Sequence, residues 1–269
     1  MADIRFNNLQ IFDAEGRRYR LFDAATNHGP AQFVGLDQYD KDEFLILGSH
    51  YHEKNHPRYR KQRSRFHKFR LYVDREDLIL DDLRQNISPL KALRMTRMWG
   101  STPKRQLQFE GFGINKARDI AWFGLAKPVS EKGNISLLRC SLKGLLKQDE
   151  ELEFFEVDTG LKVPLEKRTQ RPMYLTDLEV LDDGSLLLLL TADDLDGGRL
   201  CTNSLYRWAP GRKATLVKEE LAPENRATGM AVRHLGKGSY KIALVCDNAK
   251  DQTELPPRLV ILGQALKLH

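Results

Sequence analysis

The sequence predicts an all-β fold, a β-propeller of four-stranded antiparallel blades, and three observations lead to this prediction. Residues Tyr174–Leu221 contain four short apolar runs separated by polar or Gly-containing turns. The start of this stretch matches an earlier segment of the chain without a gap, and two further segments begin in a similar way. Irregular repeats of roughly 40–60 residues with four strands each favour a propeller over an open pair of β-sheets, which is the alternative.

The stretch Tyr174–Leu221 defines one complete blade. Asp182-Asp183-Gly184 is a tight-turn signal between its first two apolar runs. The second run has no polar residue, which is typical of a strand buried on both faces. The expected strands are Leu178–Leu181, Leu186–Leu190, Ser204–Trp208 and Ala214–Glu219.

Three further blades are expected from the repeat. Gln32–Gly48 lies over the start of the complete blade, a third copy begins at Arg118–Trp122 with a turn at Phe123-Gly124, and a fourth begins at Thr228–Val232. The equivalent anchor positions are then Gly35, Asp119, Asp177 and Gly229. The other expected strands are Phe66–Val73, Leu78–Leu80, Ile135–Ser141, Glu153–Val157, Lys241–Cys246 and Arg258–Leu262.

Residues 1–269 are expected to form a single propeller domain. The segments Ile4–Phe12 and Arg18–Phe22 predict an N-terminal strand pair that joins the C-terminal strands and closes the ring, which removes exposed edges. Four blades and this pair suggest five blades in all, with four or six as alternatives. Ser88-Pro89 predicts the start of one short helical insertion over residues 86–100, with Ser as N-cap and Pro at the first helical position.

The basic charge of the chain is concentrated in one window. The chain has 43 Lys and Arg against 37 Asp and Glu, a net charge of +6. Residues 54–70 hold eight of these bases and no acid, so the rest of the chain has 35 bases against 37 acids. A local basic window, here with a loop over residues 50–66, is typical of a patch that faces an anionic partner.

Cysteine usage and hydrophobicity indicate a cytoplasmic protein. The three cysteines, Cys140, Cys201 and Cys246, are scattered and show no paired metal spacing, which suits a reducing compartment. The N-terminal residues contain no apolar core of a signal peptide, and no apolar run is long enough to span a membrane.

The chain resembles a bacterial β-propeller family without an established activity, distantly like the esterase-like propeller phytases. The resemblance rests on the segments that start at Phe44, Gly113 and Thr176 and covers most of residues 32–250. Gly48-Ser49-His50 matches a Gly-Ser-His element with a basic tail. Asn115 matches a second element, in which Arg118-Asp119 replaces Glu-Gly and Lys127 stands where an arginine is usual. The resemblance implies a propeller fold and no particular chemistry.

The predicted binding surface is the face that carries the loop between the second and third strands of each blade, together with the start of each first strand. We call it the loop face. Arg binds phosphate in a bidentate manner, and Tyr59, Phe66, His67 and Phe69 could stack on bases, so RNA or single-stranded DNA is one expected partner. A protein whose acidic groups contact the arginines is the other. The alternative is a solvated loop followed by a strand with charged outer residues. The predicted binding residues are His50, Arg58, Arg60, Lys61, Arg63, Arg65, Arg118 and Lys127.

Two weaker patterns support a catalytic alternative. His50 and His52, two residues apart on an extended segment, could bind zinc with Asp193. Asp119, Asp177 and Glu179 could supply paired carboxylates for a calcium site or for acid–base hydrolysis, although acids near strand starts also cap turns.

These observations favour a non-enzymatic propeller scaffold that binds a protein or nucleic acid through its basic loop. No nucleophile elbow, phosphate-binding loop or dinucleotide fingerprint is present, so no catalytic residue and no cofactor is assigned. The alternative is a metal-assisted hydrolase of phosphorylated or ester substrates, with Asp119, Asp177 or His50 in the reaction.

Overall fold

Strands account for almost all the regular structure in the described part of the chain, which confirms the all-β prediction. The computed structural model describes residues 2–3, 8–12, 18–23, 33–48, 66–75, 77–87, 108–147, 152–192, 202–222, 226–247, 258–262 and 265–267. Within these ranges the helical segments are α3 (Leu142–Lys147) and the 3-10 turn η4 (Lys116–Arg118), and no helix there is long and apolar enough to cross a membrane. The predicted helical insertion lies outside the described residues except for Asn86 and Ile87, which belong to a strand.

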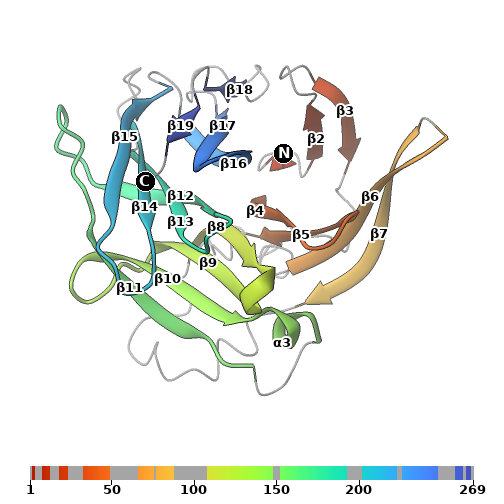
Figure 1. Ribbon diagram of the computed structural model, residues 1–269, viewed down its shortest axis with the longest axis horizontal. Coiled ribbons are helices and arrows are strands. Elements are labelled where there is room, and N and C mark those ends of the chain that lie inside the picture. Colours follow the sequence, from red (N-terminus) through yellow and green to blue (C-terminus); the bar gives the residue numbers. More distant parts are fainter. Residues whose placement is uncertain are drawn as a thin grey trace, which may run out of the picture.

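Four antiparallel four-stranded sheets form a ring of blades (Figure 1), so the propeller architecture is confirmed. In the first three blades the chain runs from the innermost strand outward. The first blade consists of β4 (Phe33–Gln38), β5 (Glu43–Gly48), β6 (Phe66–Asp74) and β7 (Asp77–Ile87). The second consists of β8 (Gln108–Asn115), β9 (Ile120–Lys127), β10 (Asn134–Ser141) and β11 (Phe155–Lys162).

The third and fourth blades complete the series. The four strands predicted for the complete blade are those of the third blade, and the turns at Gly184 and Gly211 lie where expected. The third blade consists of β12 (Met173–Val180), β13 (Leu186–Ala192), β14 (Asn203–Trp208) and β15 (Thr215–Leu221). The fourth consists of β16 (Arg226–Gly236), β17 (Ser239–Asp247), β18 (Arg258–Ile261) and β19 (Leu266–Lys267), of which β18 and β19 both pair with β17.

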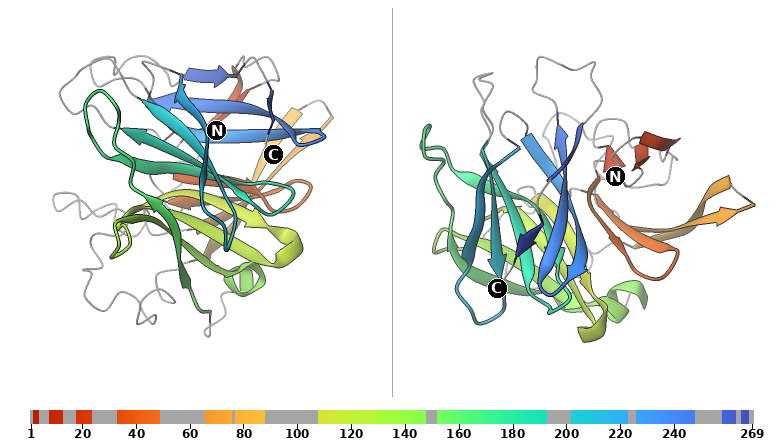
Figure 2. Two further views of the ribbon diagram at one scale, coloured as in Figure 1. Left: turned by 60° about the vertical axis from the view of Figure 1, so that its left-hand side comes forward. Right: turned by 45° about the horizontal axis from the view of Figure 1, so that its top comes forward.

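The N-terminal strands form a smaller sheet of their own. In it, β2 (Asn8–Phe12) pairs with both β1 (Ala2–Asp3) and β3 (Arg18–Asp23). This sheet lies between the fourth blade and the first (Figures 1 and 2). Among the described residues the N-terminal strands pair with one another and not with the C-terminal strands, in contrast to the shared closing sheet that we expected. The ring therefore has four four-stranded blades with a three-stranded sheet in the gap between its ends.

A β-bulge in the inner strand shows that the four blades repeat one element. The pairing of each inner strand with its neighbour contains a shift in register, and Gly35, Asp177 and Gly229 each directly follow such a shift. The predicted equivalence of these three residues is therefore confirmed. The prediction for the second blade is wrong, because its inner strand is β8, with Phe112 after the shift, and Asp119 lies in the turn that follows β8.

The hydrophobic core lies between neighbouring blades. One cluster joins the first and second blades through side chains such as Phe66, Phe112 and Phe123. The leucines of β13 alternate between two other clusters. Leu186, Leu188 and Leu190 pack toward the second blade, and Leu187 and Leu189 pack toward the fourth. All residues of β13 are buried, as predicted for a strand with two covered faces.

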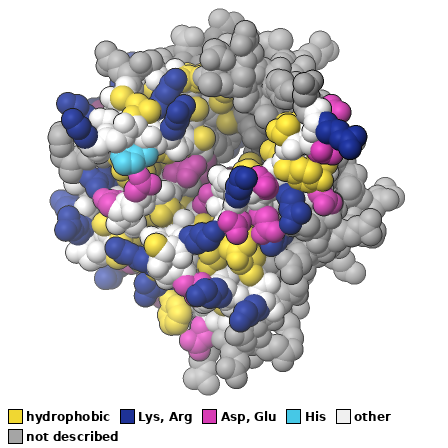
Figure 3. Space-filling model, turned by 45° about the vertical axis from the view of Figure 1, so that its right-hand side comes forward, with side chains coloured by type: hydrophobic (Ala, Val, Ile, Leu, Met, Phe, Trp, Pro, Cys, Tyr) yellow, Lys and Arg dark blue, Asp and Glu magenta, His cyan; other side chains and the backbone are white. Residues whose placement is uncertain are grey.

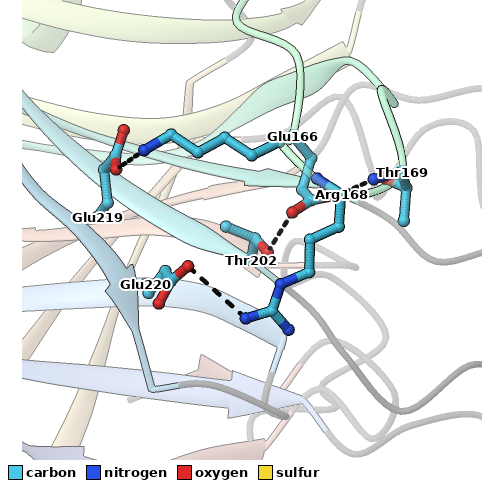
Figure 4. A network of polar contacts seen from close by, with 7 residues as sticks. Glu166, Arg168, Thr169, Thr202, Glu219 and Glu220 are labelled. Atoms are coloured by element: carbon cyan, nitrogen blue, oxygen red, sulfur yellow. Dashed lines mark hydrogen bonds and ion pairs between the residues drawn. The ribbon is translucent and has the colours of Figure 1, made fainter.

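The connection from the second blade to the third is fixed by one carboxylate (Figure 4). Glu166 is buried, and its Oε2 accepts hydrogen bonds from the backbone N–H groups of Arg168 and Thr169, while Oε1 accepts one from the Thr202 hydroxyl. Burial acts to raise the pKa of Glu166, but these hydrogen bonds together outweigh it and lower the pKa to about 2. The two residues that follow Glu166 form ion pairs with β15, Lys167 with Glu219 and Arg168 with Glu220. The connection is thereby attached to the strands of the third blade.

Candidate functional site

Four carboxylates from three inner strands gather at the centre of the ring. We call Asp37 of β4, Glu110 of β8, and Asp177 and Glu179 of β12 the central carboxylates. Asp177 interacts electrostatically with Glu110 and Asp37, and Glu179 interacts with Asp37 and Asp177. Figure 3 shows acidic side chains near the hollowed centre of the face that it draws. The inner strands thus place like charges together, an arrangement that proteins use either for chemistry or for structural hydrogen bonding.

Two of the central carboxylates connect neighbouring blades through the main chain. Asp37 accepts hydrogen bonds from the backbone N–H of Gln38 and from that of Ile114 on β8, both at 2.6 Å. Asp177 accepts one from the N–H of Leu178 at 2.8 Å and one from the N–H of Met230 on β16 at 2.6 Å. In each case one oxygen binds the following residue and the other binds the inner strand of the next blade. Both oxygens of each side chain therefore have a structural role.

The environment of Asp37, Asp177 and Glu179 favours their protonated forms. Burial raises the pKa of Asp37 to about 6, although its two backbone hydrogen bonds act in the opposite direction. Burial also raises the pKa of Asp177 well above its ordinary value, against the same kind of hydrogen bonds. The pKa of Glu179 is raised well above its ordinary value by burial and then by the charges of Asp37 and Asp177. These groups hold protons at a higher pH than ordinary carboxylates do.

Asp119, the expected partner of Asp177 in hydrolysis, lies in a different place. It has a left-handed backbone conformation at the end of η4, and its Oδ1 accepts a hydrogen bond from the N–H of Lys143 in α3. Its Oδ2 accepts a hydrogen bond from the hydroxyl of Ser141. Asp177 lies beside Gly111 on β8, and the strand from Gly111 to Asn115 alone spans about 13 Å. The two carboxylates share no partner, so the structure does not bring them together for catalysis.

Arg118 and Lys127 lie at opposite ends of the second blade. Arg118 belongs to η4, and its guanidinium lies next to Gly184 in the turn after β12. Both η4 and the turn after β12 connect the first strand of a blade to the second, and we call the end of the blades that carries these connections the turn face. Lys127 ends β9 at the loop face, with its Nζ 5.8 Å from the centre of the Tyr174 ring. Of the two, only Lys127 therefore lies on the predicted binding surface.

The remaining predicted site residues lie outside the described residues. They are His50, His52, Arg58, Arg60, Lys61, Arg63, Arg65 and Asp193. The basic loop leaves the first blade at Gly48 of β5 and returns at Phe66 of β6, and both ends are at the loop face. In the described ranges, no group of three or more His, Cys, Asp or Glu side chains is arranged to hold a metal ion.

The end of the basic window is part of the first blade. Phe66, His67 and Phe69 are buried in β6, so they are not available to stack on nucleic-acid bases. Lys68 and Arg70 both form ion pairs with Glu43 of β5. The alternative of a strand with charged outer residues is therefore confirmed for residues 66–70. The other six bases of the window, from Lys54 to Arg65, lie outside the described residues.

Sequence reasoning identified Asp177 and Glu179 but missed Asp37 and Glu110. The gapless internal match already contained a signal for Asp37, because it sets Asp37 opposite Glu179. The structure confirms this equivalence, since both residues lie two positions after the shift in register. Glu110 lies between residues that pair on either side of the shift in β8, a strand that the sequence prediction did not contain.

Comparisons with known proteins identify no family for this chain. No family model matches this chain, and no curated protein sequence matches it, so the family resemblance is supported only in its propeller fold. Among solved structures, the chain is similar to the Hadza microbial sialidase Hz136, with 9% identity and a TM-score of 0.38 over 87% of this chain. It is also similar to a chain in an S. cerevisiae structure of Dbp5 bound to Nup159, Gle1, IP6 and ADP, with 11% identity and a TM-score of 0.35 over 90% of this chain. The match spans 45% of the first of these chains and 58% of the second, and neither carries an argument about function.

Proposed function

We propose that this protein is a non-enzymatic propeller scaffold that binds an acidic protein or a nucleic acid through its loop face. The observation that supports the proposal is the position of the basic loop, which starts and ends at this face between β5 and β6. Residues 54–65 carry six bases and no acid, and Lys127 of the second blade lies at the same face. A cluster of this charge attracts phosphate or carboxylate groups at long range.

The carboxylates that we considered for hydrolysis have other roles, and this supports a scaffold over an enzyme. Asp177 uses both oxygens for backbone N–H groups, and Asp119 caps the start of α3. Because Phe66 and Phe69 are buried, recognition of a nucleic acid would depend on phosphate contacts more than on stacking. We therefore expect binding that depends strongly on salt and weakly on sequence.

Binding measurements with two anionic probes test the proposal. The probes are a fluorescein-labelled single-stranded oligouridine and a poly-glutamate peptide, titrated with the full chain at several salt concentrations. We expect the wild-type chain to bind, with a binding constant that falls as salt is added. The slope of the logarithm of this constant against the logarithm of the salt concentration should become shallower by roughly 3 when Arg58, Arg60, Arg63 and Arg65 are replaced by Gln. The matched control replaces four exposed bases elsewhere by Gln, and it should keep the wild-type slope. These four are Arg212, Lys213, Arg233 and Lys241.

The outcomes are distinct. Binding of the oligouridine alone would identify a nucleic-acid partner, and binding of the peptide alone would identify an acidic protein. No binding of either probe at 0.1 M salt, or equal loss in both variants, would contradict the proposal.

A further inference from the structure

The two outer strands of the first blade extend beyond the strand beside them. The pairing of β5 with β6 ends at Glu43 and Arg70, whereas β6 and β7 stay paired as far as Asp74 and Asp77. Residues 71–74 and 77–80 therefore form a two-stranded extension that continues past the blade at the turn face. Figures 1 and 2 show it projecting from the ring. An isolated hairpin is marginally stable by itself, so a projecting hairpin is suited to gain a neighbour.

One edge of this hairpin presents free main-chain groups. Along an antiparallel strand, successive residues turn their N–H and C=O groups to opposite sides. The N–H of Leu71 points away from β7, because it donates to the carbonyl oxygen of Asp42 at 2.8 Å. The N–H and C=O of Val73, two residues further along, point to the same side. No strand in the described part of the chain lies there.

A hollow lies beside this free edge. Its volume is about 390 Å³, and it is lined by residues 40–43 of the β4–β5 turn and by Arg70, Tyr72 and Val73 of β6. The hollow therefore occupies the space into which β5 would continue if it were longer. The apolar side chain of Val73 is 68% exposed at its border. The free edge and the hollow therefore lie side by side, between β6 and the turn that precedes β5.

The charges around the hollow add a preference for a basic residue. Glu43 pairs with Lys68 and Arg70, and Asp40 pairs with Lys116. The carboxylate of Asp42 makes no hydrogen bond or ion pair with any described residue. Lys41, on the same turn, is positively charged and reduces the attraction of Asp42 for a basic residue. We therefore expect the pair with Asp42 to give selectivity, and the main-chain hydrogen bonds to give most of the affinity.

We infer that the free edge of β6 binds an extended segment of a partner protein by strand addition. The segment exchanges hydrogen bonds with the main chain of Val73, and an apolar side chain of the segment packs on the exposed side chain of Val73. A Lys or Arg of the segment pairs with Asp42. This surface lies at the turn face, opposite the loop face, and the inference does not depend on the function proposed for the basic loop.

Peptide binding tests the main-chain part of the inference. The probe is a fluorescein-labelled peptide, acetyl-Thr-Val-Thr-Val-Arg-Thr-amide, titrated with the full chain and followed by anisotropy. Methylation of alternate peptide nitrogens gives two further probes, and only one of them blocks the N–H groups that face β6. We expect saturable binding that one methylation pattern weakens at least about tenfold and the other at most about twofold. No binding, or an equal effect of both patterns, would overturn the inference.

Variants of the chain test the position of the site. Val73→Pro removes the free N–H, and the hairpin should persist because proline is tolerated where an edge N–H faces solvent. We expect an unchanged unfolding midpoint and a loss of peptide affinity of at least about tenfold. Val73→Thr keeps the N–H as the matched control and should lose less than about threefold. Wild-type affinity of a folded Val73→Pro variant would overturn the inference. If that variant fails to fold, the methylated peptides still decide.

Two further measurements address the partner. Asp42→Asn should reduce the preference for this peptide over one with Glu in place of Arg, and an unchanged preference would contradict the role of Asp42. Sedimentation of the wild-type chain should show that it does not self-associate through this edge. Self-association that Val73→Pro abolishes would assign the edge to a second copy of the chain and overturn the inference of a foreign segment.

Discussion

Single carboxylates connect the blades at the centre of the ring, and this connection has an electrostatic cost. Asp37 satisfies the N–H of Ile114 on the next inner strand, and Asp177 does the same for Met230. A buried carboxylate loses its hydration, and the hydrogen bonds compensate only in part. The pKa of Asp37, raised to about 6, shows that burial outweighs its two hydrogen bonds. The site thus tolerates charge poorly at neutral pH.

Stability should therefore rise on mild acidification. The pKa of Asp37 is higher in the folded chain than its ordinary value of 3.8, so the folded state binds the proton more tightly than the unfolded state. This contribution is fully present below about pH 4 and is lost as the pH rises through about 6. We expect the free energy of unfolding to fall by about 1 kcal/mol between pH 5 and pH 7.5 from this group alone, and Glu179 adds to it with the same sign.

Urea unfolding across this pH range checks the prediction. The double variant Asp37→Asn with Glu179→Gln should show a smaller decrease than the wild-type chain, because neither amide titrates and, of Asp37, Asp177 and Glu179, only Asp177 keeps a carboxyl with a raised pKa. Asp158→Asn is the control, since the pKa of Asp158 is lowered, mainly by the backbone N–H of Gly160, and this carboxyl does not titrate between pH 5 and pH 7.5. An equal decrease in the double variant and the wild-type chain would show that Asp37 and Glu179 do not carry the effect.

At the scale of elements, the third blade was predictable and the second was not. The turns at Gly184 and Gly211 and the all-apolar β13 carry strong local signals, so the strands of the third blade were predicted correctly. In the second blade Gly124 suggested a turn, but it lies within β9. A side chain there would collide with Leu175 and with the carbonyl oxygen of Glu110. Gly124 is thus required for close packing between blades, a tertiary constraint without a local signal.

Tertiary contacts without a local sequence signal also explain why only part of the candidate site was predicted. Asp177 and Glu179 were noticed because they begin a well-predicted blade, whereas the role of Asp37 depends on a contact with Ile114, 77 residues away. Lys68 and Arg70, the last two bases of the basic window, show the same limit. Their charge pattern is that of a basic patch, and only the register of β5 and β6 shows that Glu43 pairs with both.

The turn around Asp119 gives a test at this scale. Asp119→Ala removes the acceptor for the Lys143 N–H and the Ser141 hydroxyl, and it places alanine in a left-handed conformation with a φ of 54°. We expect it to reduce the free energy of unfolding by about 1–2 kcal/mol. Asp119→Asn keeps an acceptor and tolerates this backbone conformation, so its cost should be clearly smaller. Chemical denaturation of both variants checks the order, and equal stability of Asp119→Ala and the wild-type chain would refute the capping role.

At the scale of the whole molecule, the ring depends on inner strands that approach one another closely. Gly111 of β8 has a φ of 98°, and a Cβ there would lie 2.6 Å from the backbone nitrogen of Leu178 on β12. On the opposite side of β8, a Cβ at Gly35 of β4 would lie 2.7 Å from the backbone nitrogen of Phe112. The second inner strand is therefore packed between the first and the third with no space for side chains at these points. The blades can come together only because glycine stands at both contacts.

Gly35→Ala should accordingly weaken the whole ring. Its Cβ would lie 2.7 Å from the backbone nitrogen of Phe112 and closer still to the Phe112 Cβ, so the two inner strands would have to separate. We expect the free energy of unfolding to fall by about 2–3 kcal/mol, the range of overpacked cores. Gly160→Ala is the control, because no atom lies within 4 Å of its Cβ position and only its φ of 68° opposes the change, at a cost of about 1 kcal/mol. If the two variants lose equal stability in urea, contact between the inner strands does not limit the assembly of the ring.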